Sequence, residues 1–256
     1  MIKLSTLFSG SAGNCTLVQS EKTAVLVDCG RNCKAVCTAL CEKGLDISDI
    51  SAVFVTHEHR DHISALDVLM RKRAIPIHVT SPSARELCRG RSAAENAVVH
   101  TGMVFEEAVG DLKIKSFPLP HDSAAHVGYV IEDESGDRAA VATDMGYATQ
   151  EAFNNLCGCR QIVLEANHDV DMLKTGPYPY QLKIRILSRF GHLSNVDCGE
   201  LCRGLWESGT KAFLLAHLSE ENNTPDVALN TVRGAFQGCD CLPVIKIAKR
   251  NEITEL

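Results

Sequence analysis

The chain has 256 residues, of which 45% are hydrophobic and 23% charged, and its formal net charge is −6. These values are typical of a globular protein with one large domain or two small ones, and they exclude collagen-like, coiled-coil and disordered chains. No apolar run approaches the ~18 residues of a membrane-spanning helix, and the net acidity argues against coating of nucleic acid through bulk charge.

Short apolar runs, typical of strands, alternate along the chain with amphipathic patterns, typical of helices. In chain order, strands are predicted at Ile2–Phe8, Thr16–Gln19, Ala24–Asp28, Ala52–Val55, Ile77–Val79, Leu112–Phe117, Val127–Ile131, Ala139–Ala142, Gln161–Leu164, Ala212–Ala216 and Val244–Ile247. Helices are predicted at Asn32–Lys43, Asp61–Lys72, Pro82–Cys88, Thr149–Asn155, Tyr180–Arg189, Asn195–Glu207 and Pro225–Phe236. This order predicts an α/β protein, and because no linker divides the sequence we expect a single domain over residues 1–256.

Twelve cysteines would indicate a disulfide framework in a secreted chain. The N-terminal segment has no apolar leader region, however, so we expect no signal peptide and a cytoplasmic location. Cys33, Cys37 and Cys41 share one predicted helix face with aliphatic residues, and Cys198 and Cys202 share another. This spacing favours buried thiols that pack in the core over a zinc or redox role.

Polar residues follow several of the apolar strands. The segments AVLVDCG and AVATDMG each end in Asp-X-Gly, whereas SAVFVTHEH, IVLEANHD and AFLLAHLS run into histidine. Polar residues gathered at strand ends are typical of a site built on the edge of a sheet.

The strongest signal is the segment Thr56-His57-Glu58-His59-Arg60-Asp61-His62, which follows a predicted strand and opens a predicted helix. In an extended stretch His57 and His59 point to the same side and can bind one metal ion, while Asp61 and His62 can turn toward a second. Zinc and similar cations favour such nitrogen and oxygen ligands.

This motif resembles the signature of the metallo-β-lactamase superfamily, and the resemblance extends along essentially the whole chain, most closely to the YycJ/WalJ group. The matching segments are FSGSAGN (8–14), VDCG (27–30), THEHRDH (56–62), LPHD (119–122), ATDMG (142–146), EANHD (165–169), FGHLSN (190–195) and AHLSEENN (216–223). The last four also resemble tRNase Z and the PhnP phosphodiesterase. The resemblance implies a four-layer αββα sandwich with a dinuclear metal site at the edge of its sheets.

The resemblance also implies seven ligands for two divalent ions, with Zn²⁺ or Mn²⁺ expected and iron also compatible with the set. They are His57, His59 and His121 for one ion, Asp61, His62 and His217 for the other, and Asp144 between the two. His126 competes with His121, which is preferred because Pro118 and Pro120 end the preceding strand there. For Asp144 the alternative is a plain turn residue.

The related phosphodiesterases imply that His192 protonates the leaving group and that Glu165 orients it, so His192, Glu165 and the ligand Asp61 are the expected catalytic residues. The alternative for His192 is a simple helix-entry residue. Residues expected to support ligands or contact substrate are Asp28, Asn14, His168, Ser194 and Ser219. The alternative for Asp28 is a structural turn carboxylate, and the alternative for His168 is a simply exposed residue. The alternative for loop 9–14, which contains Asn14, is a plain hairpin loop.

Two basic stretches accompany the metal motif. Lys174, Lys183, Arg185 and Arg189 precede His192, and Arg71, Lys72 and Arg73 follow the motif. These basic residues indicate either a surface that contacts a polyanion or a solvated surface whose positive charges stabilise the C-terminal ends of helices. Tyr178 and Tyr180 are candidates for base stacking.

The expected function is therefore a phosphodiesterase, with a metal-bridging hydroxide as nucleophile and nucleic acid or another phosphodiester as substrate. The YycJ/WalJ resemblance implies a 5′-to-3′ exonuclease acting on DNA. The alternative is hydrolysis of a small cyclic phosphodiester, lactone or thioester, because one metal frame serves several chemistries. No membrane association is expected, and the sequence leaves the oligomeric state open.

Overall fold

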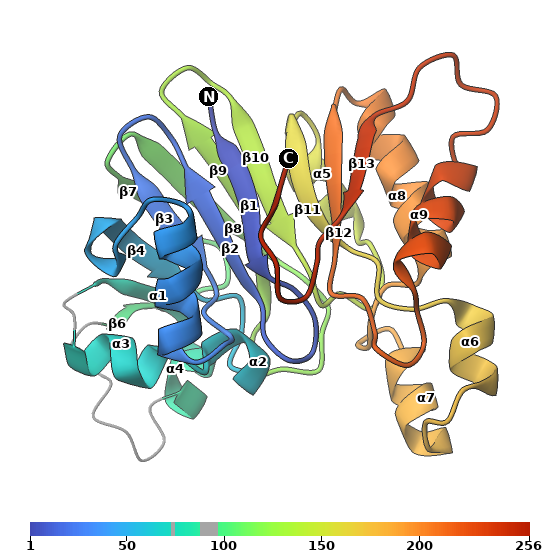
Figure 1. Ribbon diagram of the computed structural model, residues 1–256, viewed down its shortest axis with the longest axis horizontal. Helices are drawn as coiled ribbons and strands as arrows, with labels where there is room; N and C mark the ends of the chain where they lie inside the picture. The colour runs from blue at the N-terminus through green and yellow to red at the C-terminus, as the bar shows by residue number, and fades with distance from the viewer. Residues whose placement is uncertain (73–74, 88–96) are drawn as a thin grey trace.

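Two seven-stranded sheets face each other in the computed structural model, which describes residues 1–72, 75–87 and 97–256 (Figure 1). The first sheet has the strand order β14-β1-β2-β3-β4-β5-β6, and the second has the order β13-β12-β11-β10-β9-β8-β7. Helices cover the outer face of each sheet. The arrangement is the predicted αββα sandwich.

The strands of the first sheet are β1 Lys3–Phe8, β2 Cys15–Gln19, β3 Ala24–Val27, β4 Ile50–Phe54, β5 Ile77–Thr80, β6 Ala97–His100 and β14 Thr254–Glu255. Those of the second are β7 Glu106–Val109, β8 Leu112–Pro118, β9 Val127–Asp133, β10 Arg138–Ala142, β11 Gln161–Glu165, β12 Ala212–Ala216 and β13 Val244–Ile247. The helices are α1 Cys33–Glu42, η1 Ile47–Asp49 (a 3₁₀ turn), α2 Arg60–Ile63, α3 Leu66–Lys72, α4 Ser81–Leu87, α5 Gln150–Leu156, α6 Val170–Thr175, α7 Tyr180–Ile186, α8 Asn195–Glu207 and α9 Pro225–Gly234.

Three apolar clusters separate the four layers. One lies between the sheets and includes Phe54, Tyr129 and Leu214. A second lies between the first sheet and helices α1, α3 and α4, and a third between the second sheet and helices α5, α8 and α9. Because both faces of the central strands are buried, β3 (AVLV) and β12 (AFLLA) are continuously apolar.

Parallel crossovers bring the carboxyl ends of several strands to one edge of the sandwich. Strands β3 and β4 pair in parallel in the first sheet, and β10, β11, β12 and β13 pair in parallel in the second. Side chains on the loops that follow parallel strands meet at the same edge. Helix α2, which follows β4, lies below this edge in Figure 1.

The structure corrects the prediction of one helix over Asp61–Lys72. The chain forms two helices, α2 and α3, because the N–H of Ala65 bonds the carbonyl of Cys29 at 2.9 Å and draws the backbone out of the helix. The predicted helix Tyr180–Arg189 ends earlier, at Ile186. The short elements β6, β7, β14, α6 and η1 were not predicted. Residue Cys88 and the side chains of Arg71, Lys72 and Arg73 lie outside the described part of the chain.

None of the cysteines that the structure describes forms a disulfide bond. Cys198 and Cys202 are buried on α8, as predicted. On α1 the prediction is partly wrong: Val36 and Leu40 form the buried stripe, Cys33 and Cys37 lie at its border, and Cys41 is exposed.

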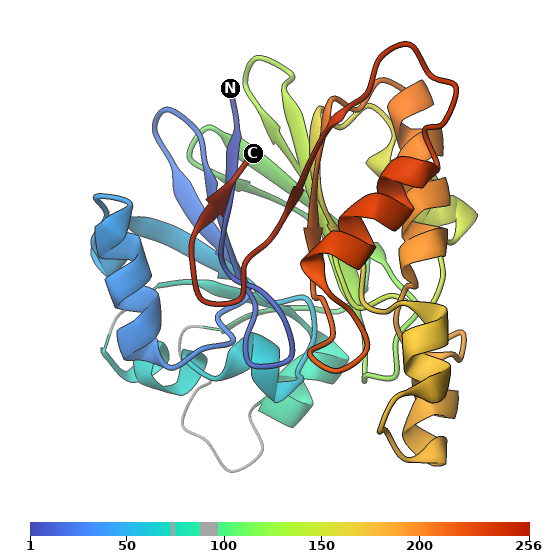
Figure 2. The ribbon, with the colours of Figure 1, turned by 45° about the vertical axis from the view of Figure 1, so that its right-hand side comes forward.

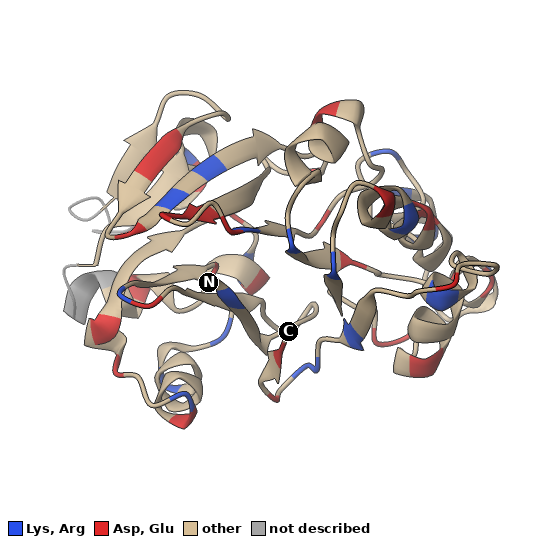
Figure 3. Ribbon diagram, turned by 90° about the horizontal axis from the view of Figure 1, so that it is seen from above, with Lys and Arg blue, Asp and Glu red and all other residues tan. Residues whose placement is uncertain are grey.

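Lys and Arg positions are interspersed with Asp and Glu positions along the ribbon in Figure 3. The net charge therefore does not mark a substrate surface by itself. Among the described residues, no helix is sufficiently long and apolar to cross a membrane.

Candidate active site

Three site residues have left-handed backbone conformations. Asp28, Asp144 and His217 have φ values of 63°, 59° and 57°, and they are the non-glycine residues with positive φ in the described ranges. Each lies just beyond the carboxyl end of a strand, β3, β10 or β12. Such conformations are disfavoured for residues with a Cβ atom, and their concentration at one sheet edge is typical of a functional site.

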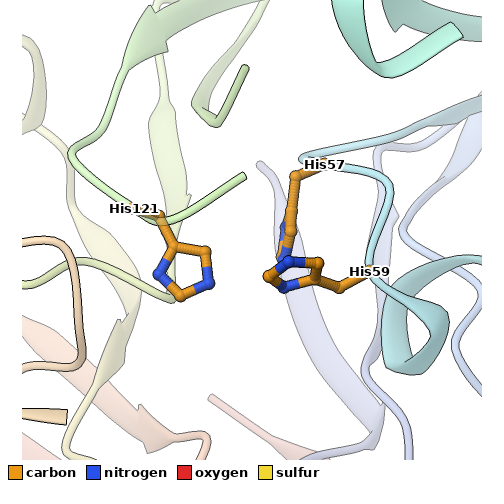
Figure 4. A group of neighbouring side chains, drawn as sticks. All are labelled: His57, His59 and His121. Carbon is orange, nitrogen blue, oxygen red and sulfur yellow. The ribbon is translucent and has the colours of Figure 1, made fainter. Parts of the chain in front are cut away.

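The first group of candidate ligands is a histidine trio. Atoms of His57, His59 and His121 that can bind a metal lie within 4.8 Å of one another. His57 and His59 come from the loop after β4, and His121 approaches from the loop after β8 (Figure 4). Sheet topology therefore unites residues that are more than sixty positions apart in the sequence.

The second group contains Asp61, His62 and His217, whose ligand atoms also lie within 4.8 Å of one another. Asp144 shares a third group with His57 and His62. Because His57 belongs to the first trio and His62 to the second, the Asp144 carboxylate lies between them.

Buried polar atoms without hydrogen-bond partners point to a metal centre. Within the described part of the chain, the atoms His57 Nε2, Asp144 Oδ2 and His217 Nε2 have no such partner. Burial alone would raise the pKa of Asp144, but the neighbouring imidazoles of His217 and His62 lower it well below its ordinary value. Imidazoles beside an ionised carboxylate become metal ligands when they lose a proton, and such a mixed nitrogen and oxygen set fits divalent cations.

Four of the candidate ligand histidines share one orientation. Their Nδ1 atoms lie near protein oxygens: 2.7 Å from Asp28 Oδ2 for His62, 3.0 Å from Thr56 Oγ1 for His57, 3.1 Å from the Gly191 carbonyl for His121 and 3.0 Å from Glu165 Oε1 for His217. Donation of the Nδ1 proton to each oxygen leaves Nε2 available as a ligand, and such partners fix the ring and raise its basicity. Thr56 in turn donates its hydroxyl proton to Asp28 at 2.8 Å.

Asn14 connects the glycine-rich loop to the second ligand group. Its backbone N–H donates to the Asp61 carbonyl at 2.7 Å, and its side-chain Nδ2 lies 3.0 Å from His62 Nε2 and 3.3 Å from Asp61 Oδ2. The neighbouring Gly30 must lack a side chain, because a Cβ there would lie 1.6 Å from the Asp61 carbonyl oxygen. This close approach holds the start of α2 against the loop.

Glu165 is fully buried at the end of β11 and contacts two imidazoles. Its Oε1 atom lies 2.7 Å from Nδ1 of His192, and its Oε2 atom accepts from the backbone N–H groups of Met145 and Leu193. Burial raises the pKa of Glu165, but His192 and the hydrogen bonds outweigh it and lower the pKa to about 2. The carboxylate is therefore ionised, and it directs the Nε2 atom of the half-buried His192 away from itself.

His126, the competitor of His121, has a different place. Its ring stacks on His57 with the centroids 4.5 Å apart, and it belongs to none of the ligand groups of the described residues. Burial lowers the pKa of His126 well below its ordinary value, so the ring is neutral. The His126 ring therefore packs against the face of the His57 ring.

Three predicted residues have other partners. Ser194 caps α8, with Oγ accepting from the Asp197 N–H at 3.1 Å. Ser219 accepts from the Asn222 N–H at 3.2 Å within a turn. His168 is buried with its carbonyl bonded to the Asn195 N–H, and burial lowers its pKa to about 4. None of these contacts reaches a ligand side chain.

Several residues that hold the loops of the candidate ligands were not predicted from the sequence. Glu58, inside the metal motif, accepts from the Ala124 N–H at 2.7 Å and lies 2.7 Å from Ser83 Oγ, which ties the loop after His121 to the motif. The Asn167 side chain donates to the backbone carbonyl of His217 at 2.8 Å. The backbone N–H of His217 donates to the Ser9 hydroxyl at 2.8 Å. Their positions within the matching segments were the available signal, but their partners are far away in the sequence.

A further trio, His78, His100 and Glu107, lies away from this site at the edge of the first sheet and on β7. His78 Nδ1 is 3.2 Å from His100 Nε2, and His100 Nδ1 is 3.8 Å from Glu107. The hydrogen bond joins the two imidazoles, and burial lowers the pKa of both rings, so we assign no metal ion to this trio.

Comparisons with known proteins agree with the fold and the motif. A family model described as the beta-lactamase superfamily domain matches residues 23–218. The chain is 35% identical over 234 residues to exodeoxyribonuclease YycJ of Bacillus anthracis, covering 90% of this chain and 88% of the relative. It is 34% identical over 237 residues to exodeoxyribonuclease WalJ of Streptococcus pneumoniae, covering 90% and 86%.

Among solved structures, the metallo-beta-lactamase fold protein YhfI from Bacillus subtilis superimposes with a TM-score of 0.75 at 20% identity, over 100% of this chain and 99% of that one. This likeness concerns the fold alone. Together with the sequence matches, it shows that the chain belongs to the metallo-β-lactamase superfamily of hydrolases, and within it to the YycJ/WalJ group.

Proposed function

We propose that this protein is a dinuclear metal-dependent phosphodiesterase that degrades DNA as an exonuclease. The observation that carries the proposal is the placement of His192, bonded to buried Glu165 at 2.7 Å, beside the two groups of candidate metal ligands. The His192 ring centroid lies 5.1 Å from that of His121 and 5.2 Å from that of His217. A proton donor next to a cationic centre suits the cleavage of an anionic ester with a poor leaving group.

The assignment of ligands is part of this proposal. His57, His59 and His121 would hold one ion, and Asp61, His62 and His217 would hold the other, with Asp144 shared. Zn²⁺ or Mn²⁺, when bound there, would supply an activated water nucleophile and neutralise charge that develops on the phosphoryl oxygens. The net charge of two divalent ions and two carboxylates is positive, which favours an anionic substrate.

The chain's own residues orient the reaction. Glu165 accepts the Nδ1 proton of His192, so Nε2 is the atom that delivers a proton to the leaving oxygen. Asp28, through His62 and Thr56, and Asn14, through Asp61, hold the ligand side chains in place. Both relatives are named exodeoxyribonucleases, which supports DNA as the substrate class.

The test compares metal-loaded wild type with His192→Ala on 5′-labelled and 3′-labelled single-stranded DNA, the matching RNA, bis-p-nitrophenyl phosphate and a lactone. We expect release of mononucleotides from the 5′ end of DNA, and a fall in kcat of about 10²–10⁴-fold on DNA in the variant. The loss on bis-p-nitrophenyl phosphate should be much smaller, because nitrophenolate departs without a proton.

His100→Gln is the matched control, since it replaces a partly buried histidine outside the site. Elemental analysis should find two metal ions in wild type and in His192→Ala. Lactone turnover without phosphodiester cleavage would overturn the proposal in favour of a small-ester hydrolase. An equal loss on DNA and on bis-p-nitrophenyl phosphate would contradict the proton-donor role of His192.

A further inference from the structure

Helix α7 and the turn after it expose an unusual set of apolar side chains. Tyr180, Ile184 and Leu187, at positions i, i+4 and i+7, are 72%, 48% and 42% exposed, and Phe190 is 59% exposed. Only Ile186 of this helix is buried. A surface helix normally turns such a stripe toward the core, so these four residues, called here the α7 face, are exposed for another reason. Figure 2 shows α6 and α7 extending below the rest of the second sheet's layer.

The charge around the α7 face is one-sided, although the whole chain is acidic. Residues 172–196 contain no Asp or Glu, and their four charged residues are Lys174, Lys183, Arg185 and Arg189. Arg185 is paired with Asp122, which lies outside this segment. The Lys183 ammonium donates to the carbonyls of Lys174 and Gly176, which leaves its charge uncompensated.

Arg189 adds a further positive charge beside an aromatic ring. Its guanidinium lies 4.5 Å from the ring centroid of Tyr147, and its side chain is exposed. Asp171 on α6 is the nearest acidic residue along the chain on the N-terminal side of the segment. The local balance is therefore positive on a molecule whose net charge is −6.

The α7 face is continuous with the candidate active site. The Phe190 carbonyl accepts from the Asp122 N–H at 3.1 Å, and the next carbonyl, that of Gly191, lies 3.1 Å from His121 Nδ1. His192 follows directly, and its N–H bonds the Ile186 carbonyl at the end of α7. Phe190 and the end of α7 therefore adjoin His192 and the His121 loop.

We propose that the α7 face binds the single-stranded part of a DNA substrate adjacent to the cleaved bond, an inference that rests on the proposed function. Bases stack on Phe190 and Tyr180, the aliphatic side chains of Ile184 and Leu187 exclude water, and the phosphates meet the uncompensated cations. The seven residues of α7 span about 10 Å at 1.5 Å per residue, so the α7 face covers a short stretch of a strand.

Two features favour this occupant over others. Exposed rings can stack only on bases that are not already stacked within a duplex, so a single strand suits them best. A two-fold contact between copies of the chain centred on this face would bring the same cations against each other, and like charges opposed across an interface are costly.

The test measures binding rather than cleavage. Fluorescence anisotropy follows a fluorescein-labelled 20-nucleotide oligothymidylate on metal-loaded His192→Ala protein, so the strand is not consumed. Adding Tyr180→Ala or Phe190→Ala alone should weaken binding roughly 5- to 150-fold, because each stacked base contributes about 1–3 kcal/mol, and the two substitutions together should weaken it further. Lys174→Gln and Arg189→Gln should each reduce the slope of log Kd against log salt by about 0.7.

Controls lie at the opposite end of the second sheet, where Leu242 and Lys211 are exposed before β13 and β12. Leu242→Ala and Lys211→Gln should leave both the affinity and the salt slope unchanged. Thermal unfolding and metal content of every variant show that the fold and metal centre are intact.

Unchanged oligothymidylate affinity in the doubly substituted protein would overturn the inference. So would sedimentation data in which these substitutions convert a dimer to a monomer while DNA affinity stays the same. Failure of the proposed function is a different outcome, in which the wild-type protein cleaves no phosphodiester. Loss of strand binding in the face variants would then still establish the binding surface.

Discussion

One carboxylate oxygen, Oε1 of Glu165, lies 2.7 Å from Nδ1 of His192 and 3.0 Å from Nδ1 of His217. The other oxygen accepts two backbone N–H groups. A single buried side chain thus orients the proposed proton donor and a proposed metal ligand together. The two rings cannot move independently of each other.

We expect Glu165→Gln to disturb both rings. An amide has one acceptor oxygen in place of two, so some of the four groups around it lose their acceptor. Each buried donor left unpaired costs about 1–3 kcal/mol, and the free energy of unfolding should fall by a similar amount. Urea unfolding of the metal-loaded protein measures this change, together with kcat on DNA.

Glu151→Gln, on the exposed side of α5, is the control for this substitution and should change stability by less than about 0.5 kcal/mol. Wild-type stability and kcat in Glu165→Gln would show that the paired contacts have no energetic role.

The second prediction concerns Glu58, which holds the loop after His121 through the Ala124 N–H. Removal of this acceptor in Glu58→Ala should loosen His121 while the Asp61, His62 and His217 group stays in place. Affinity for one of the two metal ions should fall about 10–100-fold, as is usual when a residue supporting a ligand is lost. Titration with a chelating competitor, followed by elemental analysis, measures the loss.

Ser83→Ala removes the other partner of Glu58 and leaves the Ala124 contact intact, so it should have the smaller effect. Equal loss of both ions in Glu58→Ala would contradict a role confined to the His121 loop.

Metal removal should destabilise the protein, because His57 Nε2, Asp144 Oδ2 and His217 Nε2 are then buried without partners. At a metal concentration 100 times Kd, each bound ion adds about 2.7 kcal/mol. For a chain of this size that corresponds to roughly 5–10 °C in Tm for each site. Calorimetry with and without a chelator tests this, and re-addition of Zn²⁺ or Mn²⁺ should restore the Tm. An unchanged Tm after complete removal of the metal would refute the assignment of these atoms as ligands.

A pH-dependent contribution is expected from Asp133, far from the metal groups. A hydrogen bond from Ser135, with further backbone N–H bonds, lowers the pKa of Asp133 to about 2. Because the folded-state pKa lies below the unfolded value of 3.8, the ionised carboxylate stabilises the protein above about pH 4, and this contribution is lost as the pH falls toward 2.

Asp133→Asn should therefore be less stable than wild type at pH 7, and the difference should shrink between pH 4 and pH 2. Urea unfolding at a series of pH values measures it, with the exposed neighbour in Glu134→Gln as the control. A difference between wild type and Asp133→Asn that does not depend on pH would contradict the ionised contact.

The sequence by itself determined the layered α/β class and the first metal-binding segment. Apolar runs predict strands because the residues of a strand buried on both faces must be apolar. The metal-binding segment can be recognised because its ligands lie within six residues of one another: His57, His59, Asp61 and His62. Motif resemblance supplied His121, Asp144 and His217 as candidates. The strands β6 and β7 were missed because each has only four residues and is partly exposed, so neither has the longer apolar run of a central strand.

Only the tertiary structure decided which residues meet. The parallel crossovers bring the ends of β3, β4, β10, β11 and β12 to one edge, and this proximity depends on sheet order, which no local pattern encodes. The break between α2 and α3 likewise results from a bond to Cys29, more than thirty residues earlier. Tyr180 was a candidate for base stacking from the sequence, but the exposure of Ile184, Leu187 and Phe190 was not predicted, because an apolar stripe at helical spacing normally predicts burial. Where such a stripe faces is decided by the packing of the whole chain.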